Sequence, residues 1–227
     1  MTLVVASVLI VDQAVKVWVK TQMPYGSEFP LLGLEWARFK FIENPGMAFG
    51  LTLGDEQGAG YGKLALSLFR IVAVGFLVYF IRQLIRQGAK RGMLVCFALI
   101  LAGAVGNIID SAFYGLIFSE SNYHHPGPAT MFPPEGGYAP FLFGRVVDML
   151  YFPMFQGVFP DWVPVWGNQA YLFFRPVFNI ADAAISVGVF AMLLFYRDFF
   201  REDVHAVGAA EHAKADADVG AAPVPRR

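Results

Sequence analysis

Four aspartates of this chain stand in stretches that are otherwise apolar, and carboxyl groups in such surroundings can carry out acid–base chemistry. Asp12 lies in VASVLIVDQAV, Asp110 in LAGAVGNIID, Asp148 in GRVVDMLYF and Asp182 in FNIADAAISVGVFAMLLFY. An isolated ionised carboxylate in hydrocarbon is costly unless it is paired, hydrated or protonated. Each of these side chains therefore needs an ion-pair partner, water, a proton or a function.

Two carboxyl groups held close together can activate water. They do not both ionise easily, so they share one proton and the pKa of one of them rises. One carboxylate then takes a proton from water while the protonated partner polarises a carbonyl group, as in aspartic proteases. A serine or cysteine mechanism needs a nucleophile beside a base. Cys96 is expected too deep on the inner side of its apolar stretch, and the four histidines lie outside all such stretches, so aspartate is the expected reactive residue.

The composition indicates an integral membrane protein. Of the 227 residues, 56% are hydrophobic and only 15% are charged, with a mean hydropathy of +0.51, whereas soluble domains average about 25% charged residues. A net charge of −1 offers no basic surface for nucleic acid. The single cysteine excludes an intramolecular disulfide framework and a cysteine-rich metal site. His124 and His125 are adjacent and point in different directions, so a solvated loop explains them better than a metal site.

Four apolar stretches are long enough to cross a bilayer as helices, which takes about 20 residues. The first carries Asp12 and Lys16 and lacks both a positively charged start and a signal-peptide cleavage site, so we expect it to be a retained helix. The four predicted spans are Thr2–Val19, Leu64–Ile85, Met93–Ile117 and Pro176–Tyr196.

Basic residues near the span ends predict the orientation. The short loop RQLIRQGAKRG between the second and third spans carries four cations, and Arg197 and Arg201 follow the fourth span. Such residues favour the cytoplasmic side. We therefore expect both termini in the cytoplasm and the segments 20–63 and 118–175 on the outer side.

The remaining segments complete the predicted organisation. Aromatic and charged residues alternate in LEWARFKFIENPGMAF, which favours short strands at the membrane interface. Residues 203–227 have the composition of a disordered cytoplasmic tail. The predicted fold is thus an integral membrane all-α bundle of four transmembrane helices over residues 1–200, with a small extracytoplasmic β-structured region and outer-surface loop insertions.

On this topology the acidic residues gather near the outer boundary of the bilayer. Part of this pattern has structural explanations: Asp12 and Lys16 are spaced i, i+4 and can neutralise each other, and Asn107 and Asn179 can form interhelical hydrogen bonds. Three aspartates with at most one lysine nearby are left without counter-charges, which favours a functional site.

A proton- or ion-coupled transporter is the main alternative, because intramembrane carboxylates often mark ion pathways. A transporter is expected to place them near the midplane, on broken helices of a repeated architecture. The sequence shows no internal repeat. A catalytically inactive membrane scaffold is the third alternative, and it would tolerate the loss of Asp148 or Asp182.

Five short motifs resemble those of bacterial lipoprotein signal peptidase (signal peptidase II, peptidase family A8), in the family's order and across residues 1–200. The resemblance implies an aspartic intramembrane endopeptidase of the bacterial inner membrane, with its active site on the periplasmic side. The motifs are DQAVK (Asp12–Lys16), NPGMAF (Asn44–Phe49), GNIID (Gly106–Asp110), VVD (Val146–Asp148) and FNIAD (Phe178–Asp182).

The resemblance also implies a substrate, an inhibitor and a cofactor requirement. Members of the family remove the signal peptide from diacylglyceryl-modified prolipoproteins, immediately before the lipidated cysteine. Globomycin-type cyclic peptides are expected inhibitors, membrane lipid is an expected partner, and no metal or organic cofactor is expected. The chain is expected to act as a monomer.

Carried over motif by motif, the catalytic pair falls on Asp148 and Asp182. Asp12 and Lys16 match a polar pair that supports the site. The positions expected around the active site are Asn44, Gly46, Asn107, Asp110 and Asn179.

Two features depart from the family pattern. Ser111 follows Asp110 where the family usually has arginine, and Arg145 is the candidate substitute. Residues 118–144 and 153–175 look like insertions. The second is rich in aromatic residues, so we expect it to lie on the surface of the outer leaflet.

Overall fold

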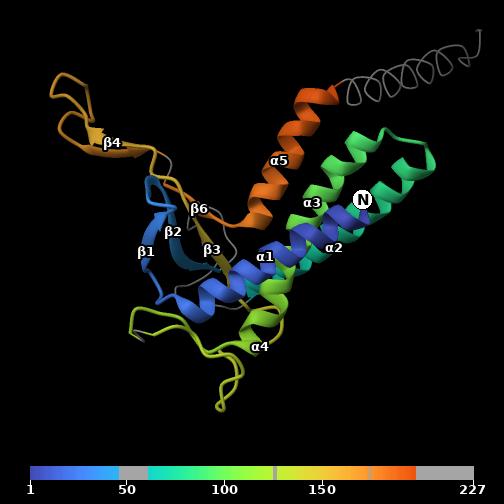
Figure 1. Cartoon of the computed structure of the whole chain (residues 1–227), viewed down its shortest axis with the longest axis horizontal. Helices are drawn as coiled ribbons and strands as arrows, with labels where there is room; N and C mark the ends of the chain where they lie inside the picture. The colour runs from blue at the N-terminus through green and yellow to red at the C-terminus, as the bar shows by residue number, and fades with distance from the viewer. Residues whose placement is uncertain (46–60, 125–126, 174, 198–227) are drawn as a thin grey trace, which may run out of the picture.

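The computed structural model describes most of the chain as a helical bundle with β-structure at one end (Figure 1). Gly46 and the predicted tail lie outside the described residues. The described ranges are 1–45, 61–124, 127–173 and 175–197.

Three helical stretches in the described ranges are long and apolar enough to cross a membrane, in agreement with three of the predicted spans. They are α1 (Thr2–Gln22), α2 (Tyr61–Arg86) and the run that begins with α3 (Arg91–Ile109). This third run continues through a π-helical turn (Asp110–Tyr114) into the short α4 (Gly115–Ile117). The helices expose large apolar side chains such as Ile10, Phe69 and Val72, as expected of helices that face lipid.

The fourth predicted span is shorter than expected. Helix α5 (Ile180–Phe195) has 16 residues, fewer than the roughly 20 of a typical span, so a count of four spans is supported only in part. The helix does not start at Pro176 because Val177 and Phe178 form strand β6 and Asn179 is the N-cap.

Helix α3 is central and packs against α1, α2 and α5. Small residues allow the close approach of α3 and α5. A Cβ atom on Gly103 would collide with the carbonyl oxygen of Ala181, and one on Gly188 would lie 2.7 Å from the carbonyl oxygen of Cys96. Small residues at helix contacts bring backbones together in membranes in this way.

The main sheet is antiparallel, with strand order β1-β2-β3-β6. Its strands are β1 (Glu28–Leu31), β2 (Leu34–Asn44), β3 (Val146–Tyr151) and β6 (Val177–Phe178). The β-structure predicted around LEWARFKFIEN is confirmed, as one long strand. Ile42 of β2 pairs with Asp148, and Leu150 of β3 pairs with Phe178. The sheet therefore places Asp148 beside the start of α5.

A buried core joins this sheet to the bundle. Val19 and Met23 at the end of α1 pack with Tyr114 and with Phe41 and Val147 of the sheet. Lys20, in the last turn of α1, is also fully buried. Its ammonium group pairs with the Glu43 carboxylate and donates to the Ser121 hydroxyl at 3.0 Å. Both apolar packing and charge thus hold the sheet on the end of α1.

The second predicted insertion contains a separate hairpin, β4 (Phe155–Val158) and β5 (Ala170–Phe173). Figure 1 shows it projecting sideways from the sheet, away from the helices. Trp162, Val165 and Trp166 in its loop are exposed. Its contact with the outer leaflet stays a prediction.

The contact of α3 with α5 yields a test of the packing. Gly103→Ala should destabilise the protein by about 1–3 kcal/mol, because the added methyl group meets backbone that has no alternative position. The measurement is thermal unfolding of the purified protein in detergent. Gly75→Ala in α2 is the matched control, since a Cβ there meets nothing within 4 Å. Equal melting temperatures for the two variants would contradict the packing described.

Candidate active site

The polar start of the last apolar stretch is a helix cap. The side chain of Asn179 accepts a hydrogen bond from the backbone N–H of Asp182 at 2.9 Å, and the Asp182 carboxylate accepts one from the backbone N–H of Asn179 at 3.4 Å. This reciprocal capping box satisfies N–H groups that a helix start leaves unpaired. The positive end of the helix dipole also favours a carboxylate in the first turn. Local structure therefore places the side chain of Asp182 in the first turn of α5.

Asp148 is held next to this cap by strand β3. Its side chain is 2% exposed and accepts a hydrogen bond from Asn179 Nδ2 at 2.7 Å. Burial and, after it, the charge of Asp182 raise the pKa of Asp148 to about 7, although hydrogen bonds from Asn179 and Asn44 oppose the rise. Asp148 therefore holds a proton far more readily than an ordinary aspartate.

Two asparagines connect the two aspartates. Asn179 contacts both Asp148 and Asp182, as described above. Asn107 Nδ2 donates to Asp182 Oδ1 at 2.8 Å, and Asn107 Oδ1 accepts from Asn179 Nδ2 at 3.2 Å. The amides thus bridge helix α3, strand β3 and helix α5, and they set the relative positions of the two carboxyl groups.

A cluster of charged side chains adjoins the two aspartates through Asn107. Lys16 is fully buried and its ammonium nitrogen is 2.9 Å from Asp12, 2.8 Å from Asp110 and 3.0 Å from Asn107 Oδ1. Asp12 accepts from the backbone N–H of Ala181 at 2.8 Å, and Asp110 accepts from that of Val147 at 3.3 Å. The expected Asp12–Lys16 pair therefore joins α1 to α3, α5 and the sheet, as a supporting element of the site.

The structure brings most of the predicted site residues together. One connected network contains Asp12, Lys16, Asn107, Asp110, Asp148, Asn179 and Asp182, and Asn44 bonds to Asp148. Their roles in catalysis stay predictions.

Arg145 lies in a different network. Its guanidinium group is 3.1 Å from Glu120 and 3.7 Å from Glu43, and it packs over the ring of Tyr138. These acids raise the pKa of Arg145 although burial opposes them. The contacts link the loop before β3 to the buried Lys20–Glu43 pair. A part for Arg145 in catalysis also stays a prediction.

Arg70 is a site residue that the sequence reading missed. It lies in SLFRIVAVGFLVYF of α2 and lines a cavity of about 340 Å³ together with Asp182 and Asn107. The sequence held the signal, since an isolated arginine inside an apolar span points to a function.

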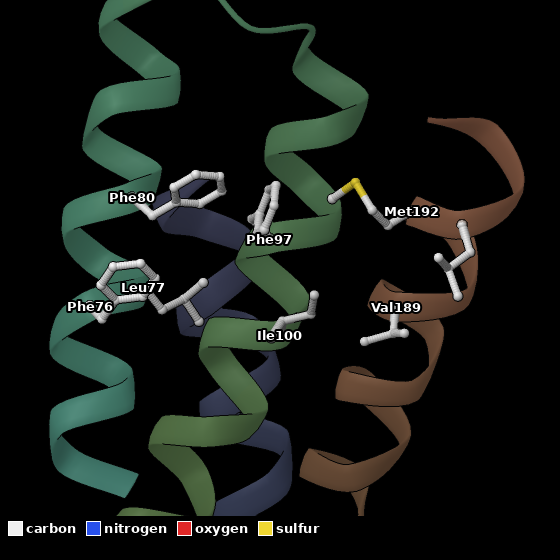
Figure 2. A pocket seen from close by; sticks show the side chains of 8 residues that line it. Phe76, Leu77, Phe80, Phe97, Ile100, Val189 and Met192 are labelled. Atoms are coloured by element: carbon white, nitrogen blue, oxygen red, sulfur yellow. The ribbon is translucent and has the colours of Figure 1, made fainter. Parts of the chain in front are cut away.

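A second, apolar cavity of about 310 Å³ adjoins the first, because Leu77 and Ile100 line both. Figure 2 shows its side chains coming from three helices, α2, α3 and α5, around a common space. We call the two cavities together the apolar groove. It leads from Asp182 along the helices, and its far part is lined by Phe76, Leu77, Phe80, Phe97, Ile100, Val189, Met192 and Leu193.

Within the described ranges, no group of three or more His, Cys, Asp or Glu side chains could hold a metal ion. Asp12 and Asp110 are neutralised by Lys16 instead. A pair of carboxyl groups in a partly buried, hydrogen-bonded setting can transfer protons, and such a role for Asp148 and Asp182 stays a prediction.

Comparison with known proteins agrees with this arrangement. A lipoprotein signal peptidase of Porphyromonas gingivalis is 50% identical over 189 residues, covering 83% of this chain and 78% of that protein. One of Amoebophilus asiaticus is 35% identical over 206 residues, covering 89% and 80%. A solved bacterial membrane enzyme, determined by the in meso method at 2.3 Å resolution, shares the fold with a TM-score of 0.55 at 22% identity, covering 87% of each chain.

The family model described as signal peptidase (SPase) II matches residues 4–198. This match spans the helices, the sheet and every predicted site residue. It agrees with the five motifs read from the sequence. The chain belongs to the signal peptidase II family, the lipoprotein signal peptidases.

Proposed function

We propose that this lipoprotein signal peptidase is an aspartic endopeptidase in which Asp148 and Asp182 activate the water that cleaves the substrate. The substrate is a diacylglyceryl-modified prolipoprotein, cut immediately before its lipidated cysteine. The observation that carries the proposal is that Asn179 donates to both carboxyl groups, with its side chain to the buried Asp148 and with its backbone N–H to Asp182 at the helix N-terminus. Family membership supports the protease activity.

The two environments favour different roles for the two aspartates. Asp182 receives hydrogen bonds from Asn107 and from the Asn179 backbone, which suit a carboxylate. Asp148 is buried and has a pKa raised to about 7, which suits a neutral carboxyl group. Asp182 is therefore the general base and Asp148 the general acid in the proposed resting state.

The proposed reaction conserves protons. Asp182 removes a proton from water, the water oxygen bonds to the scissile carbonyl carbon, and Asp148 gives its proton to the carbonyl oxygen. The resulting diol collapses when the C–N bond breaks. Asp182 passes its proton to the leaving nitrogen, and Asp148 recovers one from a diol hydroxyl. The pair returns to its starting state without a metal or an organic cofactor.

The apolar groove supports a position for the substrate. The apolar segment of the signal peptide would lie in it, between α2 and α5, with the scissile bond beside Asp182. The site lies at the end of the bundle that carries the sheet (Figure 1). With the orientation predicted from basic residues, this is the periplasmic side of a bacterial inner membrane, where water reaches the bond, and both termini are cytoplasmic.

The remaining parts of the proposal follow the family resemblance. We propose a monomer, in contact with membrane lipid, that a globomycin-type cyclic peptide inhibits by occupying the site beside Asp182. Competition between such a peptide and the prolipoprotein would support this part, and inhibition unaffected by substrate concentration would contradict it.

The first test removes one titratable proton at a time. Asp148→Asn and Asp182→Asn should each lower the rate of prolipoprotein cleavage by about 10²–10⁴-fold, the usual contribution of acid–base catalysis. The measurement is release of the signal peptide by purified protein in detergent or lipid. Asp161→Asn, in the exposed loop of the β4–β5 hairpin, is the matched control and should cleave normally. If both site variants fold and still cleave, Asp110 becomes the carboxyl group to test.

The raised pKa of Asp148 predicts how stability depends on pH. The folded protein holds the Asp148 proton up to a pH of about 7, whereas the unfolded chain loses it near pH 4. The folded state thus binds more protons, so this contribution to stability is complete below pH 4 and disappears as the pH rises through 7. Melting temperatures in detergent from pH 4 to 8 measure this effect. Asp148→Asn should fall less steeply than wild type over this range, and parallel curves would contradict the shift.

The apolar groove predicts that the rate of cleavage depends on the apolar segment of the substrate. Leu77→Trp fills the point where the two cavities meet and should lower kcat/KM for a full-length prolipoprotein about tenfold. A lipopeptide without the apolar segment should be cleaved as by wild type. Val72→Trp, on the exposed face of the same helix, is the matched control. An equal loss on both substrates would argue against this position of the signal peptide.

A further inference from the structure

Arg70 holds a positive charge where a membrane helix rarely carries one. It lies about two and a half turns into α2, inside the stretch that is long and apolar enough to span a membrane. Charged groups at such a depth are costly and face the interior of a bundle or a water-filled cavity. Arg70 lines the cavity that also contains Asp182 and Asn107, and the other lining residues are apolar.

Arg70 lies within electrostatic reach of the two aspartates. The acids that interact with its guanidinium group are, in order of decreasing strength, Asp182, Asp110 and Asp148. Lys16, the other cation of the site, is engaged by Asp12 and Asp110 on the side away from the cavity. Arg70 is therefore the cation that approaches Asp182 from the cavity.

The position next to Asp110 adds no charge. Ser111 is buried, and its hydroxyl donates to the carbonyl oxygen of Asn107 at 3.0 Å. The charged groups around Asp182 come from every surrounding element: Arg70 from α2, Asp110 from the π-helical turn, Asp148 from β3, and Asp12 and Lys16 from α1. Among the residues that the structure describes, two cations thus face four carboxyl groups, so the loss of either cation leaves an excess of negative charge around Asp182.

We propose that Arg70 is a positioning residue for the catalytic pair, which keeps Asp182 ionised as the base while Asp148 retains the proton. This inference rests on the proposed aspartic mechanism and adds a third participant to it, supplied by α2. It also gives α2 a direct influence on the reaction.

The proposal predicts a change in the pH dependence of cleavage. Without the nearby positive charge, the catalytic base loses its proton only at higher pH. Arg70→Gln should therefore move the acid limb of kcat/KM to higher pH by about one unit, in the range expected for one close opposite charge. At the acid end of the profile this shift is about a tenfold loss of kcat/KM. Arg70→Lys, which keeps the charge, should restore the limb in part or in full.

Matched variants separate this effect from others. Arg82→Gln removes the same charge from an exposed position of the same helix and should leave the profile unchanged. Arg70→Met is a second neutral variant that suits the apolar lining of the cavity, in case Arg70→Gln does not fold. The measurement is prolipoprotein cleavage from pH 4 to 9, with melting temperatures to confirm folding.

The outcomes distinguish this inference from the proposed function. An unshifted acid limb in a folded neutral variant would overturn the role of Arg70, as would a loss that is equal at every pH and not restored by Arg70→Lys. A raised KM with an unshifted limb would overturn it too, since it would show contact with substrate instead. Failure of the aspartic mechanism would appear separately, as cleavage that persists in Asp148→Asn and Asp182→Asn.

Discussion

The pairing of β3 with β6 is the constraint on which the site depends. Asp148 and Asp182 are separated by a long insertion, and two short strands bring them together. Leu150 pairs with Phe178 and Tyr151 with Val177, and the chain then enters α5 at Asn179. Because β6 runs directly into the helix cap, the cap asparagine can reach the strand aspartate. A change in this register would separate the two carboxyl groups.

The buried charges restrict how the helices and the sheet can pack around the two aspartates. An unpaired charge inside a protein costs several kcal/mol, so a buried cluster is tolerated only when every member has a partner. Lys16 meets this condition through Asp12 and Asp110, and Lys20 through Glu43. Each lysine extends from α1, so this one helix orients the π-helical turn, the start of α5 and the sheet. The relative positions of Asp148 and Asp182 are thus maintained by groups that need not react.

Polar and apolar regions of the bundle have different tasks. The end next to the sheet holds the carboxyl groups, the amides and the cations that surround them, while the apolar groove extends from Asp182 between the helices. In the proposed function this division matches the substrate, which joins an apolar signal segment to a polar scissile bond. Arg70 lies where the polar and apolar regions meet. Its charge can influence the two aspartates there without itself transferring a proton.

Local patterns in the sequence determined the apolar spans, the strand around Leu34–Asn44 and the residues of the five motifs, because hydrophobic length, alternation and residue order are properties of neighbouring residues. They also indicated the polar residues Asn179 and Asp182. The predicted start of the last helix is four residues too early, because Val177 and Phe178 form β6 and its pairing is a long-range contact. Only the tertiary structure decided that burial favours a proton on Asp148, that Arg145 joins Glu43 and Glu120, and that Arg70 faces Asp182. Burial and proximity between distant segments arise when the chain packs, and no single stretch of sequence contains them.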